Sequence, residues 1–182
     1  MLDAASNGLP LSDNPRMGTT GGSAHVLPSG EQLLALERQA RTQGTDLTQA
    51  DLVGCWRFHQ VWPKGSGTAN ALTSGLLRSL GARLELSTGQ DGVALEISNA
   101  INLGALLLRF DGAARLIGKR PLLQFSFSRL ELSLAGRTLL RQTLPPMAPK
   151  RLPFFALIGR DASGWLAARG RGGGLALWQL RP

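Results

Sequence analysis

From residue 82 to the end of the sequence, short runs alternate between apolar and polar residues, and Gly, Asn, Asp or Pro separates one run from the next. Apolar side chains at every second position suit one face of a β-strand, whereas a helix needs a spacing of three or four. Many short strands with tight turns favour an antiparallel up-and-down sheet that closes into a barrel. We therefore expect a mainly β protein built around an antiparallel barrel.

The alternation predicts one strand before this region and several within it. In the first strand, Trp56, Phe58, Gln60 and Trp62 share one face, and Arg57, His59 and Val61 share the other. The predicted strands are 54–62, 83–87, 93–97, 105–110, 113–117, 122–134, 154–158, 164–169 and 174–180. The residues between 143 and 154 include four prolines and are expected to form a loop.

Two local features sharpen this prediction. Asp111-Gly112 is a strong signal for a two-residue hairpin turn, because a type I′ turn needs positive φ at both positions. Within 122–134, the apolar parity changes between Phe127 and Leu130. Such a change at Ser128-Arg129 predicts a bulge or a sharp bend.

Helices are expected mainly before the barrel. Residues 1–28 are rich in Gly, Ser, Asn and Pro and are expected to be disordered, and 29–182 are expected to form one domain. Ser29 and Gln32 fit a capping box at the start of a helix over 30–43, which Gly44 ends. A short helix or turn is expected over 45–52. A further helix over 69–80 places Leu72, Leu76, Leu77 and Leu80 at helical spacing.

Charge is concentrated in the barrel region. The chain carries a formal net charge of +8, and residues 101–182 contain 13 basic and three acidic side chains. A folded basic surface of this kind attracts nucleic acid, an anionic membrane or an acidic partner. The first 18 residues lack the pattern of a signal peptide, and no window of about 18 residues is apolar throughout. We expect an intracellular, soluble protein.

The sequence offers little for catalysis or metal binding. One Cys cannot form an internal disulfide, and one Cys with two His cannot make an ordinary structural zinc site. His25 lies in the N-terminal segment, while Cys55 and His59 lie on the first strand without a third partner. We interpret Cys55 as a small buried residue and His59 as a solvated one. No acid–base pair of carboxylates can be singled out, so we expect a non-enzymatic protein without cofactor or metal.

The Gly-rich segment from Arg169 to Gly174 has three interpretations. It lacks the Lys-Ser/Thr ending of a phosphate-binding loop and precedes a strand, so that interpretation is weak. It is also similar to a short RGG tract that binds RNA. The flanking strand patterns favour a simple hairpin loop.

The aromatic residues, all Phe and Trp, fall within or beside the predicted strands. A barrel of about eight strands either fills its interior with side chains or holds one small ligand. For any one aromatic residue we favour a role in the core, but as a set they remain candidates for lining a ligand cavity. The candidates are Trp56, Phe58, Phe110, Phe125, Phe127, Phe155, Trp165 and Trp178.

Three stretches of the sequence resemble the plastid lipid-associated protein family, also called PAP/fibrillin. Leu52-Val53-Gly54-Cys55-Trp56 is similar to the entry strand of the family, and Gly118-Lys119-Arg120 with 122–127 is similar to its central basic turn and strand. The segment 164–177, with Arg169-Gly170 and the Gly-rich turn, resembles its C-terminal signature. The resemblance covers roughly residues 30–180.

This resemblance implies a lipocalin-like barrel that binds a hydrophobic molecule such as a lipid, a carotenoid or a quinone. It also implies a bacterial member from an oxygenic photosynthetic organism, located in the cytoplasm and peripherally associated with thylakoid membranes. Basic side chains would then face anionic lipid, each contributing on the order of 1 kcal/mol. The candidates are Arg115, Lys119, Arg120, Lys150 and Arg151.

Two other functions remain open at this stage. A barrel that binds nucleic acid would use the net charge and the segment 169–174. A barrel enzyme acting on a pigment or lipid, such as a chromophore lyase, ranks last because no catalytic group stands out.

Overall fold

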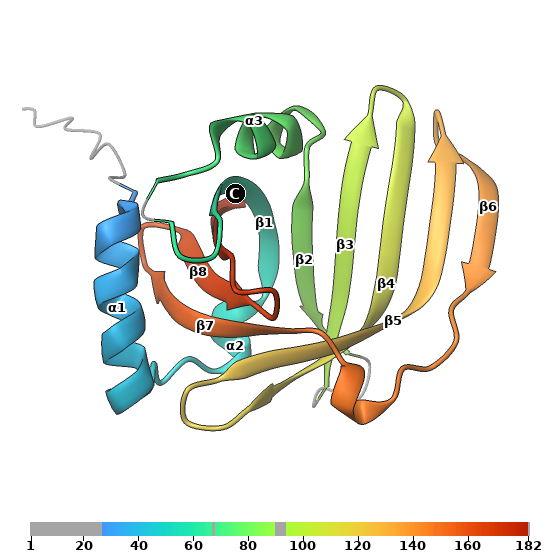
Figure 1. Ribbon diagram of the computed structural model, residues 1–182. Coiled ribbons are helices and arrows are strands. Elements are labelled where there is room, and N and C mark those ends of the chain that lie inside the picture. Colours follow the sequence, from blue (N-terminus) through green and yellow to red (C-terminus); the bar gives the residue numbers. More distant parts are fainter. Residues whose placement is uncertain (1–26, 67, 90–93, 182) are drawn as a thin grey trace, which may run out of the picture.

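The computed structural model describes residues 27–66, 68–89 and 94–181, and in this part of the chain nine antiparallel strands form one sheet (Figure 1). The strand order is β4-β3-β2-β1-β9-β8-β7-β5-β6, and a further pairing of β4 with β5 closes eight of the strands into a barrel. Barrel strands that follow one another in the sequence pair with one another. The strand β6 is attached outside the closed barrel, so β5 also pairs directly with β7. The predicted up-and-down antiparallel barrel, preceded by short helices, is confirmed.

The bounds of most elements agree with the sequence pattern, but the strand predicted over 93–97 continues to Leu103, and the strands predicted over 105–110 and 113–117 are one continuous strand. Two helices precede the barrel, and a third lies between its first two strands. The helices are α1 (Gly30–Gln43), α2 (Gln49–Leu52) and α3 (Ala71–Ser79), with a 3-10 turn η1 at Pro149–Arg151. The strands are β1 (Gly54–Trp62), β2 (Arg83–Thr88), β3 (Leu95–Leu103), β4 (Leu106–Ile117), β5 (Leu122–Leu134), β6 (Arg137–Thr143), β7 (Phe154–Asp161), β8 (Trp165–Gly170) and β9 (Leu175–Arg181). The predictions for 1–26, for His25 and for Val93 lie outside the described residues.

The hairpin predicted at Asp111-Gly112 is wrong. Both residues lie inside β4, and the hairpin into this strand lies earlier, at Gly104, whose φ is +60°. Gly112 is required for a different reason: a Cβ there would lie 1.8 Å from the backbone oxygen of Ser126 on β5. Asp111 lies on the outer face, where Arg109 and Arg129 donate hydrogen bonds to its carboxylate.

The bulge predicted near Ser128 is confirmed. Phe127 pairs with Gly112 and Arg129 pairs with Asp111, so Ser128 is the extra residue. The extra residue reverses the parity of β5, and Leu130 therefore points to the same side of the sheet as Phe127. Beyond the bulge, the C-terminal part of β5 pairs with β6, a strand that was not predicted from the sequence.

A second bulge divides the first strand between two cores. The pairing of β1 with β9 shifts at His59, between Phe58 and Gln60. Trp56 therefore packs inside the barrel, whereas Trp62 packs outside it against α1. The single face predicted for Trp56, Phe58, Gln60 and Trp62 is wrong for this reason.

Helix α1 packs on the outside of the barrel (Figure 1). Its capping box is present as predicted: the Ser29 hydroxyl accepts from the Gln32 backbone N–H, and the Gln32 side chain accepts from the Ser29 backbone N–H. Leu33 and Ala40 are buried, and between them on the same face lies the buried carboxylate of Glu37. A charged group on this face requires partners from the barrel.

Three arginines neutralise Glu37. Arg169 of β8 donates from Nε and Nη2 at 2.7 and 2.5 Å, Arg120 from the β4–β5 turn at 3.1 Å, and Arg41 from α1 itself at 2.8 Å. Arg169 also donates to the backbone carbonyl of Gly173, which connects the clamp to the β8–β9 hairpin. We call these four side chains the Glu37 clamp, and they join α1 to two separate parts of the barrel.

We expect acid to weaken the Glu37 clamp. The hydrogen bonds from Arg169 are the largest cause that lowers the pKa of Glu37 from 4.5 to about 2. A carboxyl group with a lowered pKa in the folded state stabilises the protein above its unfolded pKa, and this stabilisation is lost as the pH falls toward 2. Glu37 alone should contribute about 3 kcal/mol to the free energy of unfolding at pH 6.

Urea unfolding at pH 6 and pH 2.5 measures this contribution. The matched control is the double variant Glu37→Leu/Arg169→Met, which lacks the titrating carboxyl group and its main partner. We expect the native protein to lose more stability than the control between the two pH values. Equal losses would contradict the assignment.

Candidate functional site

A cavity of about 170 Å³ opens at the end of the barrel that α3 covers. Three aromatic residues line it, Phe58 of β1, Phe155 of β7 and Trp178 of β9, together with Leu77 of α3 and Ile101 of β3. The rest of the lining is Ala82, Arg83, Leu84 and Asn99. We call this space the mouth cavity. It is mostly apolar, and Asn99 gives it a polar margin.

The aromatic side chains of the barrel form a continuous row that ends at this cavity. Neighbouring ring centroids are 5.5 Å apart for Phe110–Phe127, 5.3 Å for Phe127–Phe125, 5.2 Å for Phe125–Phe155 and 5.3 Å for Phe155–Trp178. These separations are typical of favourable aromatic pairs. The row crosses the interior from β4 to β9, and its last two members, Phe155 and Trp178, line the mouth cavity.

Strands β3 to β6 extend the apolar surface beyond the mouth cavity. Ala114 of β4 points into the barrel core, and β4 runs without a register shift against β3, so Phe110, Leu108 and Leu106 point to the same side. Their partners on β3, β5 and β6 share this side because directly paired residues face the same way. The resulting surface, which we call the apolar wall, consists of Ile101, Leu103, Leu106, Leu108, Phe110, Leu130, Leu132, Leu134 and Leu140.

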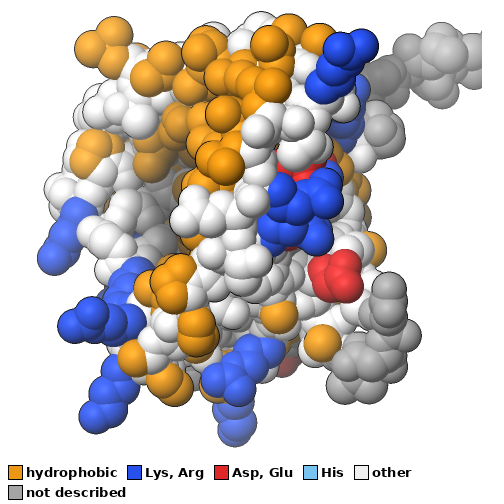
Figure 2. Space-filling model, turned by 90° about the vertical axis from the view of Figure 1, so that its right-hand side faces the viewer, with side chains coloured by type: hydrophobic (Ala, Val, Ile, Leu, Met, Phe, Trp, Pro, Cys, Tyr) orange, Lys and Arg blue, Asp and Glu red, His pale blue; other side chains and the backbone are white. Residues whose placement is uncertain are grey.

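The apolar wall is accessible to solvent near the β3–β4 and β5–β6 turns. Leu103 is 65% exposed, and Leu134 and Leu140 are also exposed. Figure 2 shows hydrophobic side chains gathered over the upper part of the β6 side of the molecule, with Lys and Arg side chains near its margins. A concentration of exposed leucines at one end of a domain marks a surface for a ligand, a partner or a membrane.

Helix α3 adds to the same end of the barrel. It is confirmed as a helix, but Leu72 is 88% and Leu76 59% exposed, and the buried residue is Ser74. The Ser74 hydroxyl accepts a hydrogen bond from the backbone N–H of Val61, which holds the helix against β1. Leu77 faces the mouth cavity, so α3 both covers the cavity and presents two leucines to solvent.

The structure divides the predicted ligand-binding residues into four groups. Phe58, Phe155 and Trp178 line the mouth cavity, and Phe110, Phe125 and Phe127 continue from it as the aromatic row. Trp56 is fully buried at the opposite end of the interior, where its indole N–H donates to the carbonyl of Leu52 at 2.7 Å. Trp165 lies outside the barrel against the α1 side, because Leu166 next to it points inward. An interior position for Trp165 was therefore wrong.

The predicted membrane-facing cations lie at the other end of the barrel from α3 (Figure 1). Lys119 and Arg120 belong to the turn between β4 and β5, and Lys150 and Arg151 to η1. Arg115 donates to the Gln124 side chain, and Arg120 belongs to the Glu37 clamp. Arg169 and Gly170, the pair in the segment that resembles the C-terminal family signature, have structural roles. Arg169 is the main partner of Glu37, and Gly170 donates its backbone N–H to the carbonyl of Gly174 within the predicted β8–β9 hairpin.

The residues considered for catalysis or metal binding do not form a cluster in the described part of the chain. Cys55 and His59 are half-buried on β1, and burial is the largest cause that lowers the pKa of His59. Within the described ranges no three His, Cys, Asp or Glu side chains gather as metal ligands do. No helix in the same part of the chain is long and apolar enough to span a membrane. The six Phe and four Trp side chains are all buried or half-buried.

Sequence reasoning missed the apolar wall and Glu37. The signal for the wall was present in the even positions from Leu106 to Leu134, but a continuous β4 through Asp111-Gly112 was needed to place them on one face. The signal for Glu37 was an acidic residue between Leu33 and Ala40 on the apolar face of a helix. Such a residue is rarely buried without a charged partner.

The comparisons with known proteins give no further guidance. No protein-family model, no curated protein and no solved structure matches this chain.

Proposed function

We propose that the protein is a non-enzymatic binding protein for a hydrophobic small molecule, which lies along the apolar wall with one end in the mouth cavity. The observation that carries the proposal is an apolar surface that is open to solvent and continues into an aromatic-lined cavity. Filling this surface with an apolar ligand would remove leucines from water, which is favourable by roughly 25 cal/mol per Å².

The size of the cavity favours an elongated ligand. At about 170 Å³ the mouth cavity is smaller than ordinary small-molecule sites, which span about 300–1,000 Å³. The lower interior is filled by the protein's own side chains, including Trp56 and Leu123. A ligand would therefore place only one end in the cavity, and the remainder would lie on the apolar wall. Acyl chains and isoprenoid chains have this shape.

The resemblance to plastid lipid-associated proteins supports a lipid, a carotenoid or a quinone as ligand and a peripheral position at the thylakoid membrane. We propose that the exposed leucines at the mouth, among them Leu72 and Leu103, meet the membrane when the ligand is exchanged. Flotation with liposomes tests this contact. A protein that stays unbound at every lipid composition would contradict it.

Organic extraction of the purified protein is the first test of ligand binding. We expect a lipid or pigment with a long apolar chain in the extract, at a ratio approaching one per protein. Extracts without any such molecule, combined with no binding of a fluorescent polyene fatty acid, would contradict the proposal.

The substitution Leu108→Glu should strongly weaken this binding. Leu108 lies in the middle of the apolar wall, and a carboxylate there would have to lose water against an apolar chain without a partner. We expect the affinity for the polyene fatty acid to fall at least about tenfold, as measured by energy transfer from the tryptophans.

Leu107→Glu is the matched control. Leu107 precedes Leu108 on β4 and points to the opposite face, where it pairs with Asn102 and Ser133. This variant should retain the affinity of the native protein, and its melting temperature corrects for any loss of stability common to both. If the two variants bind equally well, the ligand does not lie on the apolar wall.

A further inference from the structure

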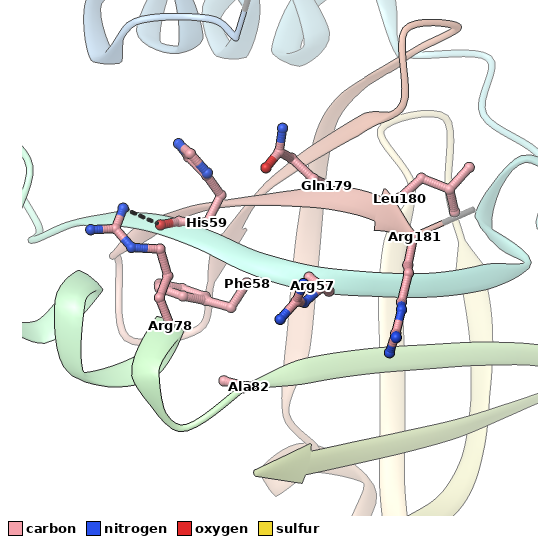
Figure 3. Close-up of a pocket in the computed structure, with 9 residues that line it drawn as sticks. Arg57, Phe58, His59, Arg78, Ala82, Gln179, Leu180 and Arg181 are labelled. Carbon is pink, nitrogen blue, oxygen red and sulfur yellow. Dashed lines mark hydrogen bonds between the residues drawn. The ribbon is translucent and has the colours of Figure 1, made fainter. Parts of the chain in front are cut away.

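A second pocket, of about 400 Å³, lies beside the mouth cavity and is lined by basic residues (Figure 3). Arg57 comes from β1, Arg181 from β9 and Arg78 from α3, so three elements each contribute one guanidinium. The remaining lining is Phe58, His59, Gly81, Ala82, Gln179 and Leu180. No acidic residue lines the pocket.

The three arginines have no carboxylate partner in the described parts of the chain. The ion pairs in the described parts of the chain involve other arginines, such as Arg83 with Glu85 and Arg141 with Glu131. Arg78 donates only to the backbone carbonyl of His59, at 3.1 Å. Other arginines, such as Arg115 and Arg171, also lack a carboxylate and bond to amide or backbone oxygens. What distinguishes this pocket is that three arginines without a carboxylate partner line one space.

Two of the three arginines lie close together on one face of the sheet. Arg57 also lies directly opposite Arg83 on β2, whose charge is paired with Glu85. Arg57 pairs with Gln179 on β9, and Arg181 lies two residues further along that strand, so both arginines lie on the same face as diagonal neighbours. Diagonal neighbours are about 7–8 Å apart, a separation that one oxyanion between two long side chains can bridge.

Donors dominate the polar surface of the pocket. The carbonyls of Leu77 and Arg78 at the end of α3 already accept from the backbone N–H groups of Ala82 and Gly81. The positive field also acts on His59: after burial, the charge of Arg78 is the next cause that lowers the pKa of its imidazole. Planar guanidinium groups bind oxyanions through paired N–H donors.

We propose that Arg57, Arg78 and Arg181 together bind a phosphate-type oxyanion, either of a soluble phosphate ester or of a lipid headgroup. Phe58 and Ala82 line both this pocket and the mouth cavity, so the two sites share a wall. The anion site does not depend on a ligand in the mouth cavity, and it is tested separately from the Leu108 variant.

Calorimetric titration with inorganic phosphate tests the site directly. The variants Arg57→Gln and Arg181→Gln each remove one charge from the pocket, and we expect each to weaken phosphate binding by roughly tenfold. Arg115→Gln is the matched control, because it removes the same charge from β4 outside the pocket. We expect the control to bind phosphate as the native protein does.

Vesicles distinguish the two sources of the anion. Phosphatidylcholine vesicles with and without phosphatidic acid are floated with the native protein and with Arg57→Gln, in the presence and absence of free phosphate. Binding that needs phosphatidic acid, Arg57 and the absence of phosphate supports a lipid headgroup in this site. Phosphate binding without this vesicle dependence supports a soluble phosphate ester. Absence of phosphate binding, or an equal loss in Arg115→Gln, would overturn the proposal.

Discussion

Glu37→Gln is expected to destabilise the protein by about 3–5 kcal/mol, a large part of the 5–15 kcal/mol that stabilises an ordinary domain. The Glu37 side chain is only 4% exposed and accepts from Arg169, Arg120 and Arg41. Glutamine keeps the shape but not the charge, so the partly buried guanidinium of Arg169 would lose its counter-ion. The melting temperature should fall by roughly 10 °C.

Two further variants separate this effect from simple loss of contact. Arg41→Gln removes an ion pair whose arginine is 56% exposed, and such helix pairs contribute only about 0.3–0.5 kcal/mol. The double variant Glu37→Leu/Arg169→Met replaces both charges with apolar groups and should recover most of the loss. If Glu37→Gln costs no more than Arg41→Gln, the clamp does not hold α1 on the barrel.

Glu37 also illustrates what the sequence could reveal. Helix α1, its capping box and its end at Gly44 were predictable because they depend on neighbouring residues. The partners of Glu37 were not, because Arg120 and Arg169 are 83 and 132 residues away. Only the assembled barrel brings them to one place.

The barrel itself was predictable from period-two alternation, whereas its irregularities were predictable only in part. The bulge at Ser128 changes the parity of leucine and phenylalanine positions, which is visible in the sequence. The bulge at His59 leaves aromatic residues at Trp56, Phe58 and Trp62, so the sequence shows no change of parity. Here the partner strand β9 determines which side chain enters the core.

The candidate site shows the same division. Six of the eight predicted aromatic residues belong to the mouth cavity or to the aromatic row, because strand aromatics that point inward meet in a small barrel. The accessible leucines of the apolar wall were not predictable as a surface. Nothing in the alternation distinguishes Leu123, which is buried, from Leu134, which is exposed. That difference comes from the extension of β4, β5 and β6 beyond the closed part of the barrel.

Gly112→Ala is expected to cost at least about 3 kcal/mol, because its methyl group cannot fit between β4 and β5. The ideal Cβ position lies 1.8 Å from the Ser126 carbonyl oxygen and 2.8 Å from the Phe127 Cα. Both are backbone atoms, so no side chain can rotate away, and the strands must separate beside the bulge at Ser128. Thermal unfolding measures the loss, which should lower the melting temperature by several degrees.

Gly75→Ala is the control, because it adds the same methyl group where space is available. Gly75 lies inside α3, and no atom outside its helix backbone lies within 4 Å of its ideal Cβ. Alanine is favoured over glycine in a helix by up to about 1 kcal/mol, so this variant should be as stable as the native protein or more stable.

Gly112 has no positive φ, unlike Gly104 in the hairpin, so a loss of stability in Gly112→Ala reports the contact between strands and not a turn. An unchanged melting temperature of the Gly112→Ala protein would show that β4 and β5 do not approach this closely. The assignment of residues to the apolar wall, which depends on the register of these strands, would then be wrong.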